Sequence, residues 1–312
     1  MSPRDRFQHD VATGRWSLPV VALITLAVWM LTAQRPLADG GALLCAGVTA
    51  YLLAELNTRF MLIRARTALP SCIFLCLFAA TPFLFQWSTG CLLPVFFTCM
   101  LFALFRSYDS YRASATIFHA FLFLGLGSIV FPCLFWLSPL MFLHMVFLRS
   151  FSAKTFFAGI IGLLIPYWLI LGYSLCTGNY DRFPDMMAAP FRWEAPDYGS
   201  VGLPFVAAWG ASLLLFVAFV AFYSVSAYKD KVQTRILLKT IAWMGVWLQA
   251  LMAVHPQGAH LLLPVFFIPT AILGGRLYAL TFGLYVRISF YTSLALIFFL
   301  FLFGLWMHLF NS

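Results

Sequence analysis

Long apolar runs, separated by short polar segments, recur from Ser17 almost to the end of this 312-residue chain. They number eleven and lie at about 17–32, 42–57, 68–86, 91–105, 114–132, 134–148, 156–176, 201–224, 236–254, 259–274 and 282–309. A helix needs about 20 apolar residues to cross the hydrocarbon core of a bilayer, so eleven spans would use roughly 220 positions. The pattern predicts an all-α protein, a polytopic bundle of about eleven transmembrane helices.

The composition excludes a water-soluble globule. Hydrophobic residues make up 63% of the chain and charged residues only 9%, whereas about a quarter of the residues of a soluble domain are charged. We therefore expect a cytoplasmic N-terminal segment at 1–16 and a single transmembrane helical domain at 17–309, with an external loop at 177–200. Residues 33–36 contain no small-x-small cleavage site, so we expect the first run to be retained as a signal anchor.

The basic residues predict the orientation. The net charge of +9 arises from 19 Lys and Arg against 10 Asp and Glu. When alternate loops are assigned to the side of the N-terminus, 16 of the 19 basic residues fall there, and only Arg35, Arg182 and Arg192 fall opposite. Basic residues collect in cytoplasmic loops, where they meet anionic membrane lipid. We therefore expect a cytoplasmic N-terminus, an external C-terminus and no nucleic-acid partner.

One region leaves the topology open. The runs at 91–105 and 134–148 are short, and the sequence Trp-Leu-Ser-Pro at 136–139 fits either an outer turn or part of a re-entrant pair. If residues 114–148 dipped into the membrane and returned, Arg149 and Lys154 would keep their side. Charge counting does not distinguish that form from two crossings.

The segment 177–200 is the first candidate site. It contains four of the ten acidic residues and two of the three external arginines, together with five aromatic residues. Carboxylates, guanidinium groups and flat rings suit the binding and acid/base chemistry of a sugar or pyrophosphate headgroup. The candidate catalytic residues here are Asp181 and Asp185, and the candidate substrate-binding residues are Arg182, Arg192 and Trp193. The alternative is a solvated loop whose aromatic residues belong to the interfacial belt.

Three more candidates lie at the ends of other runs. His255 is a candidate catalytic base, His260 a candidate substrate-binding residue, and Asp39 a candidate general base at the membrane surface. The alternatives are interfacial histidines without a catalytic role and an acid in a turn. The i, i+5 spacing of the histidines does not align them on one helix face, and the seven cysteines form no CxxC or Cys/His cluster. We therefore expect no metal site and no cofactor.

Two stretches resemble the polytopic C-type glycosyltransferases, membrane enzymes that transfer a sugar from a polyprenyl phosphate carrier on the outer face. Residues 104–114, continuing into 123–128, are similar to the basic cytoplasmic turn and Gly-rich span of that family. Residues 260–269, with Gly274 and Gly275, are similar to its late span with an "LP…P" pattern. These stretches cover under a fifth of the chain.

The chain departs from that family in one respect. The family carries its catalytic acid in a long first external loop, whereas this loop has eight residues and Asp39 is its only acid. The chain also resembles small uncharacterised bacterial inner-membrane families. Both resemblances imply a bacterial inner (cytoplasmic) membrane location, and fold likeness does not transfer function.

Three functions follow as hypotheses. The first is a glycosyltransferase-like protein, dependent on a polyprenyl-phosphate sugar, that handles a lipid-linked sugar at the outer face for envelope glycoconjugate assembly. The second is a non-catalytic subunit packing against a partner membrane protein in an envelope complex. The third, a transporter, is disfavoured because Glu55 lies at the end of its run and no acid falls at mid-membrane. A single cavity bordered by Asp39, His255 and the 177–200 loop would favour a site.

Overall fold

The computed structural model describes residues 14, 16–32, 36–65, 67–178, 182–192, 195–199, 201–281 and 283–310. Within these ranges the chain is helical and contains no strand, which confirms the all-α class. The α-helices are α2 (Ser17–Thr32), α3 (Pro36–Phe60), α4 (Leu69–Ala79), α5 (Leu93–Arg106), α6 (Ser114–Val130), α7 (Ser138–Phe147), α8 (Ala153–Thr177), α9 (Arg182–Ala188), α10 (Leu203–Ser226), α11 (Val232–Val254), α12 (Ala259–Leu280) and α13 (Leu284–Phe310). The 3-10 turns are η1 (Pro82–Phe85), η2 (Thr89–Leu92), η3 (Pro132–Leu137), η4 (Ala189–Phe191), η5 (Ala227–Lys229) and η6 (Pro256–Gly258).

Each of the eleven apolar runs contains a helix. In the part of the chain that the structure describes, seven segments are long and apolar enough to cross a membrane: Ala38–Phe60, Thr89–Arg106, Ala153–Thr177, Leu203–Ser226, Val232–Val254, Pro256–Leu280 and Leu284–Met307. Four shorter apolar helices complete the set: Ser17–Thr32, Leu69–Ala79, Ser114–Val130 and Pro132–Phe147. This architecture is compatible with an integral, multi-pass membrane protein.

The structure corrects the expected boundaries of two segments. The first loop was expected to last until Gly41, but α3 begins at Pro36. Proline at the first helical position and an acid in the first turn, here Asp39, both favour a helix start. The run at 68–86 was expected to be one helix, but α4 ends at Ala79 and the chain bends into η1 at Pro82, since proline cannot donate the next hydrogen bond of an α-helix.

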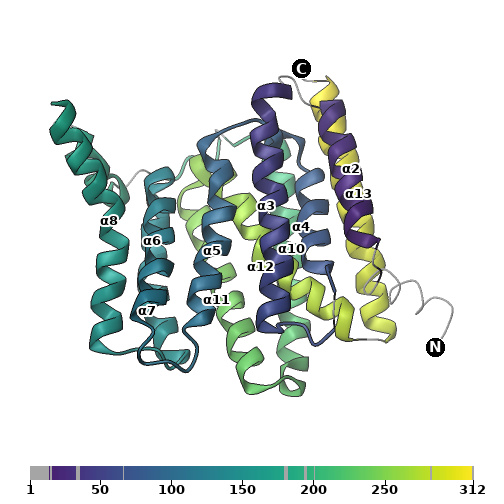
Figure 1. Ribbon diagram of the computed structural model, residues 1–312. Helices are drawn as coiled ribbons and strands as arrows, with labels where there is room; N and C mark the ends of the chain where they lie inside the picture. The colour runs from purple at the N-terminus through teal and green to yellow at the C-terminus, as the bar shows by residue number, and fades with distance from the viewer. Residues whose placement is uncertain are drawn as a thin grey trace.

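Successive long helices run in opposite directions (Figure 1), so α2 and α13 begin at one end of the bundle and α13 finishes at the other. We call the first the basic end, because it carries the turns after α3, α5, α7, α10 and α12. The described basic residues at or near these turns are Arg59, Arg64, Arg106, Arg112, Arg149, Lys154, Lys231, Arg235, Lys239, Arg276 and Arg287. We call the opposite end, which carries Arg192, the pocket end.

Residues 114–148 form a helical hairpin. α6 runs from the basic end to a bend at Phe131, and η3 and α7 return to the basic end. There the amide of Asp109 donates to the carbonyl of Leu148 at 2.9 Å and joins the two flanking turns. At 1.5 Å per residue α6 is about 25 Å long, close to the ~30 Å of a hydrocarbon core.

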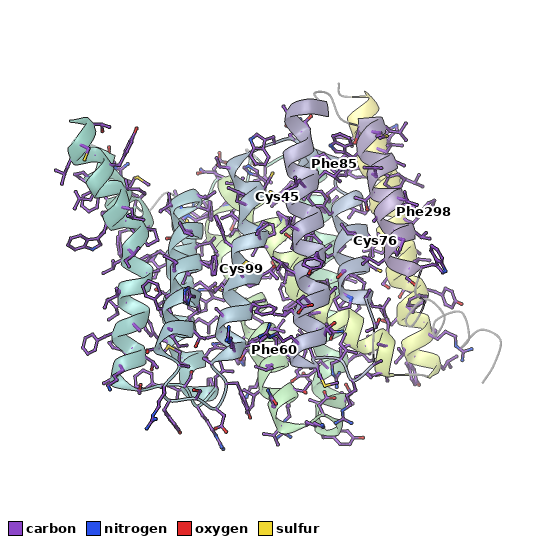
Figure 2. All side chains as sticks on the ribbon, in the orientation of Figure 1. Cys45, Phe60, Cys76, Phe85, Cys99 and Phe298 are labelled. Atoms are coloured by element: carbon purple, nitrogen blue, oxygen red, sulfur yellow. The ribbon has the colours of Figure 1, made fainter. Side chains whose placement is uncertain are left out.

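Helix α12 forms the centre of the bundle and packs against α4, α5, α10 and α11. Glycines permit this close packing. A Cβ atom on Gly275 would lie 2.8 Å from the ring of Pro70 on α4, and one on Gly274 would lie 2.6 Å from the ring of Phe219 on α10. Figure 2 shows the contrast with α13, where Phe298 lies at the outer edge of the bundle and is exposed.

A buried ion pair fixes the basic end of α12. The Arg276 Nε donates to Asp230 Oδ2 at 2.8 Å and its Nη1 donates to Ser226 Oγ at 2.9 Å. The guanidinium also lies 5.0 Å from the ring centroid of Tyr223. Both charged side chains are only 3% exposed. Arg276, expected as a cytoplasmic basic residue, is therefore neutralised within the protein and joins α12 to the α10–α11 turn.

Candidate functional site

Among the described residues, two hollows at the pocket end are lined by candidate residues. The first, which we call the Trp pocket, has a volume of about 310 Å³. It is lined by Trp136, Pro190, Phe191, Arg192, Trp247, Ala250, Leu251, Val254 and His255. The second, which we call the His260 pocket, has a volume of about 160 Å³ and is lined in part by Gln86, Trp87, Ser88, Cys91 and His260. Together they take in most of the described candidate residues.

The two tryptophans of the Trp pocket are held by hydrogen bonds between elements distant in sequence. The bend at Pro132 starts η3, which carries Trp136, and Trp247 comes from the last third of α11. Trp136 Nε1 donates to the carbonyl of Pro190 at 2.8 Å, and Trp247 Nε1 donates to the carbonyl of Trp136 at 2.9 Å. Because both indole N–H groups donate hydrogen bonds, the rings are fixed in orientation. Both rings are partly exposed.

The Arg192 guanidinium reaches the Trp pocket from the loop after η4. Its Nη2 donates to Asp185 Oδ1 at 2.5 Å, and both side chains are exposed. An exposed ion pair contributes at most about 1 kcal/mol, so an anionic ligand can compete with Asp185 for the guanidinium. Asp185 therefore restrains the side chain of Arg192, a residue that lines the pocket, without holding it tightly.

His255 lies directly after α11 and is half-buried in the wall of the Trp pocket. Residues 195–199 are tied to the same place, because Tyr198 Oη donates to the carbonyl of Ala253 at 2.6 Å. Residues 195–199 and the end of α11 are therefore joined. An imidazole, a guanidinium and two indole faces around one hollow suit a ring-shaped polar molecule that carries an anionic group.

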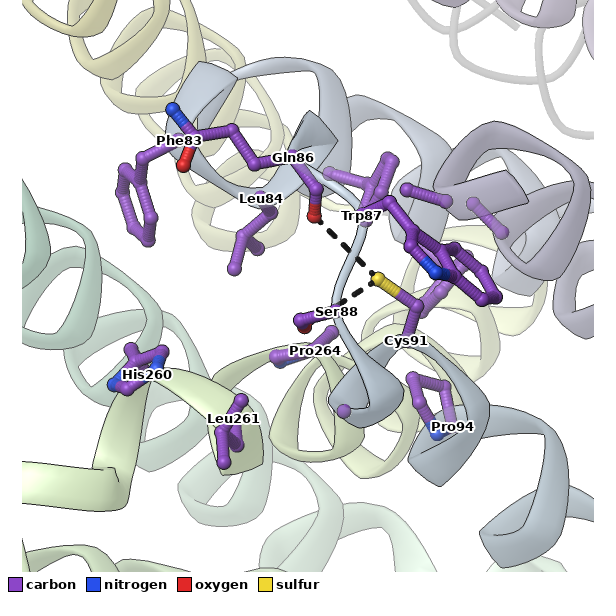
Figure 3. Close-up of a pocket in the computed structure, with 15 residues that line it drawn as sticks. Phe83, Leu84, Gln86, Trp87, Ser88, Cys91, Pro94, His260, Leu261 and Pro264 are labelled. Atoms are coloured by element: carbon purple, nitrogen blue, oxygen red, sulfur yellow. Dashed lines mark hydrogen bonds between the residues drawn. The ribbon is translucent and has the colours of Figure 1, made fainter. Parts of the chain in front are cut away.

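The His260 pocket lies on the other side of the η6 turn. In Figure 3, His260 lies on one side of the hollow, and Trp87 and Cys91 lie on the other. Cys91 Sγ lies 3.7 Å from the carbonyl oxygen of Gln86, to which it donates, and 3.8 Å from Ser88 Oγ. These contacts lie within η2 and the segment that joins η1 to η2, and Gly90 in η2 packs against the side chain of Leu261 in the first turn of α12.

Asp39 supports the wall of the His260 pocket. It is 7% exposed, in the first turn of α3, and its Oδ1 accepts from the amide of Trp87 at 3.2 Å. A Cβ on Gly41 would lie 2.5 Å from the Trp87 ring, so the ring lies flat on this glycine. Asp39 holds the Trp87 loop in place, and in this structure its carboxylate is turned to that loop.

The predicted site residues are thus divided between two pockets. Arg192 and His255 meet in the Trp pocket, with Asp185 paired to Arg192. His260 lines the other pocket, and Asp39 holds the amide of Trp87, which lines that pocket as well. Asp181, Trp193 and the side chain of Arg182 lie outside the described residues. The two pockets are separate, so Asp39, His255 and the 177–200 segment do not border the single cavity that would have marked one site, although each pocket opens at the pocket end.

Sequence reasoning missed the aromatic walls of both pockets. Trp87 and Trp136 lie at the ends of apolar runs, where tryptophan is common at membrane interfaces, and Trp247 lies within a run. Their positions in the sequence carry no further signal, because the hydrogen bonds that orient them join distant elements. Within the described ranges, no three His, Cys, Asp or Glu residues lie close enough together to hold a metal ion.

Comparison of the chain with protein-family models, curated proteins and solved structures finds no match.

Proposed function

We propose that the protein crosses the bacterial inner membrane eleven times, with the basic end in the cytoplasm and the pocket end outside. Support comes from the alternating helix directions and from the gathering of basic residues at one end, because Lys and Arg concentrate in cytoplasmic loops. In this arrangement the hairpin at 114–148 makes two short crossings. Arg276 and Lys239 lie near the cytoplasmic face, and the two pockets face outward.

We further propose that the Trp pocket binds the sugar-phosphate headgroup of a lipid-linked sugar used in envelope glycoconjugate assembly. The observation that carries this proposal is the meeting of Arg192 and His255 with two oriented indole rings in one hollow. Tryptophan offers a flat apolar face with fixed orientation, and arginine recognises phosphate with two parallel hydrogen bonds. A volume of about 310 Å³ is at the small end of ligand pockets, which suits a headgroup whose lipid tail stays in the bilayer.

The resemblance to the C-type glycosyltransferases supports an enzymatic form of this proposal. An acceptor hydroxyl oxygen would attack the anomeric carbon of the bound sugar while the bond from that carbon to the phosphate oxygen breaks. His255 would take the hydroxyl proton as general base. Arg192 would offset the charge that develops on the departing lipid phosphate, an electrostatic role that is strongest in a partly dry cleft. Asp185 would act as a positioning residue for Arg192.

Binding of a polyprenyl-phosphate sugar to the purified protein in lipid nanodiscs tests the proposal. We expect Arg192→Gln and Trp247→Ala to weaken binding by on the order of tenfold. The exposed Trp168 on α8 supplies the control, since Trp168→Ala removes an indole outside both pockets. Absence of binding by the unaltered protein, or an equal loss in the control, would overturn the proposal. His255→Gln should retain binding and lose transfer.

A second function, the non-catalytic subunit, is favoured by the pocket-end half of α8. This half leans away from the bundle (Figure 1) and exposes Trp168, Leu169 and Tyr173. Exposed aromatic and apolar residues on a helix offer a surface for a partner membrane helix. Envelope glycoconjugate profiles distinguish the two functions. Trp pocket variants should be defective under the first function, whereas Trp168→Ala/Tyr173→Ala should be defective under the second.

A further inference from the structure

A second kind of hollow lies at the basic end, between α7 and α11. This basic cleft has a volume of about 270 Å³ and is lined by His144, Phe147, Arg235, Lys239 and Trp243, among others. It lies at the opposite end of the bundle from the Trp pocket and shares no residue with it. The mechanism proposed for the Trp pocket makes no use of it.

The basic cleft is lined by two positively charged side chains, those of Arg235 and Lys239. Arg235 and Lys239 lie one helical turn apart on α11, so their side chains share a face. Among the residues that the structure describes, no carboxylate pairs with either of them. Lys239 Nζ instead lies 5.9 Å from the ring centroid of Phe147, which holds the ammonium in the cleft. Arg276, by contrast, is paired with Asp230.

The depth of these charges indicates what would neutralise them. Lys239 is the eighth residue of α11, roughly 10 Å along the axis from the start of the helix. In a membrane this depth is near the boundary between headgroups and hydrocarbon, where an ammonium is costly unless it reaches water or an anion. A phosphate group on a lipid of the same leaflet is at this depth.

The protein surface next to Arg235 and Lys239, on the side toward the pocket end, is suited to an acyl chain. Trp243 lies one turn beyond Lys239 and is exposed, and Val246 on the same helix is exposed as well. On the facing helix, Leu143 and Val146 are also exposed. Polar headgroup contacts therefore lie next to an apolar surface that runs away from the basic end, which is the order of groups in a phospholipid.

We propose that the basic cleft binds the phosphate group of an anionic glycerophospholipid from the leaflet at the basic end. Arg235 and Lys239 bind the phosphate, and Trp243 contacts the glycerol and the first part of an acyl chain. The bound lipid fills the space between α7 and α11 and joins the hairpin at 114–148 to the central part of the bundle. This inference requires membrane insertion, but it does not depend on the sugar-binding proposal.

Native mass spectrometry of the purified full-length protein tests the proposal. The probes are a short-chain phosphatidylglycerol, the phosphatidylcholine with the same chains, and inorganic phosphate. We expect phosphatidylglycerol to bind in preference to phosphatidylcholine, and Arg235→Gln/Lys239→Gln to bind it on the order of tenfold more weakly. The control Arg112→Gln/Lys154→Gln removes the same two residue types from exposed positions of the basic end outside the cleft, and it should bind as the unaltered protein does.

Each other outcome overturns a stated part of the proposal. Equal binding of the two lipids would exclude recognition of anionic charge. An equal loss in the control would show that the general charge of the basic end attracts the lipid. Binding of inorganic phosphate as tight as that of phosphatidylglycerol would assign the cleft to a free phosphate. Thermal unfolding of the variants in detergent identifies loss of fold, and Arg235→Lys/Lys239→Arg should restore binding.

Discussion

Helices α12 and α13 follow one another in the chain and are both long and apolar, yet they occupy opposite environments. In α12 and the short turn before it, 83% of the span window is buried, whereas in α13 the share is 17%. The more apolar of the two is the exposed one, with a mean hydropathy of 2.2 against 1.6. Lipid is as apolar as leucine, so hydropathy identifies a membrane span without locating it in the bundle.

Small and polar residues explain the difference. α12 has Gly274 and Gly275 against neighbouring rings, and Arg276 in a buried ion pair. α13 packs by one side only, where Gly304 lies against Pro82, and on the other side Leu294, Phe298 and Phe299 are exposed. Close approach of helices in a membrane requires small residues and internal polar contacts. Whether a helix lies at the centre or at the edge of the bundle is therefore determined by its few small and polar residues.

The largest expected effect concerns the ion pair of α12. Replacing Asp230 by Asn leaves the Arg276 guanidinium buried without its counter-charge, a loss of about 3–5 kcal/mol. We expect a clearly lower unfolding temperature for Asp230→Asn in detergent, measured by intrinsic tryptophan fluorescence. The double variant Asp230→Leu/Arg276→Met removes both charges and should recover most of the loss. An unchanged midpoint in Asp230→Asn would contradict the structural role given to this pair.

A smaller effect is expected from added volume. Gly275→Val inserts a side chain where Pro70 already lies 2.8 Å from the Cβ position, and overpacking costs about 1–3 kcal/mol. The matched change on α13 is Ala295→Val, at an exposed position, and it should leave the unfolding midpoint nearly unchanged. If both variants lowered the midpoint equally, α13 would be as closely packed as α12, and the contrast would fail.

The smallest effect concerns the contact between the two helices. Tyr278 Oη on α12 donates to Ser293 Oγ on α13 at 2.9 Å. Hydrogen bonds between membrane helices contribute about 0.6 kcal/mol on average, so Tyr278→Phe should lower the midpoint slightly. Tyr291→Phe on the exposed side of α13 is the control and should have no effect. Loss of the fold in Tyr278→Phe would show that α13 depends on this contact far more than proposed.

The sequence predicted the helices well because apolar length alone selects a membrane helix. All eleven runs contain a helix, and among the described residues seven helical segments are long and apolar enough to cross a membrane. The errors, at Pro36 and Ala79, occur where proline and an acid in a first helical turn decide a boundary more precisely than hydropathy does. Gly274 and Gly275 were noticed only for a family resemblance, and their packing against α4 and α10 could not be read from the sequence.

The candidate site was predictable only in part. Residue type and location at a span end selected His255, His260 and Arg192, and all three border a pocket. Their distribution was not predictable, because the η6 turn separates the two histidines into different pockets. Trp136 and Trp247 were not predicted as site residues. Hydrogen bonds between distant segments orient them, and no local sequence pattern indicates such bonds.

The most direct test of the account is the side of the membrane on which each end of the bundle lies. Reporter fusions at residues 190, 232 and 312 sample the pocket end, the basic end and the C-terminus. Each position is fused in turn to a reporter enzyme that is active only outside the cytoplasm and to one that is active only inside. Each position is therefore assayed twice. We expect external signals at 190 and 312 and a cytoplasmic signal at 232, because the basic end should be retained inside. An external signal at 232, or a cytoplasmic one at 190 or 312, would contradict the eleven-span topology and the proposed outward-facing site.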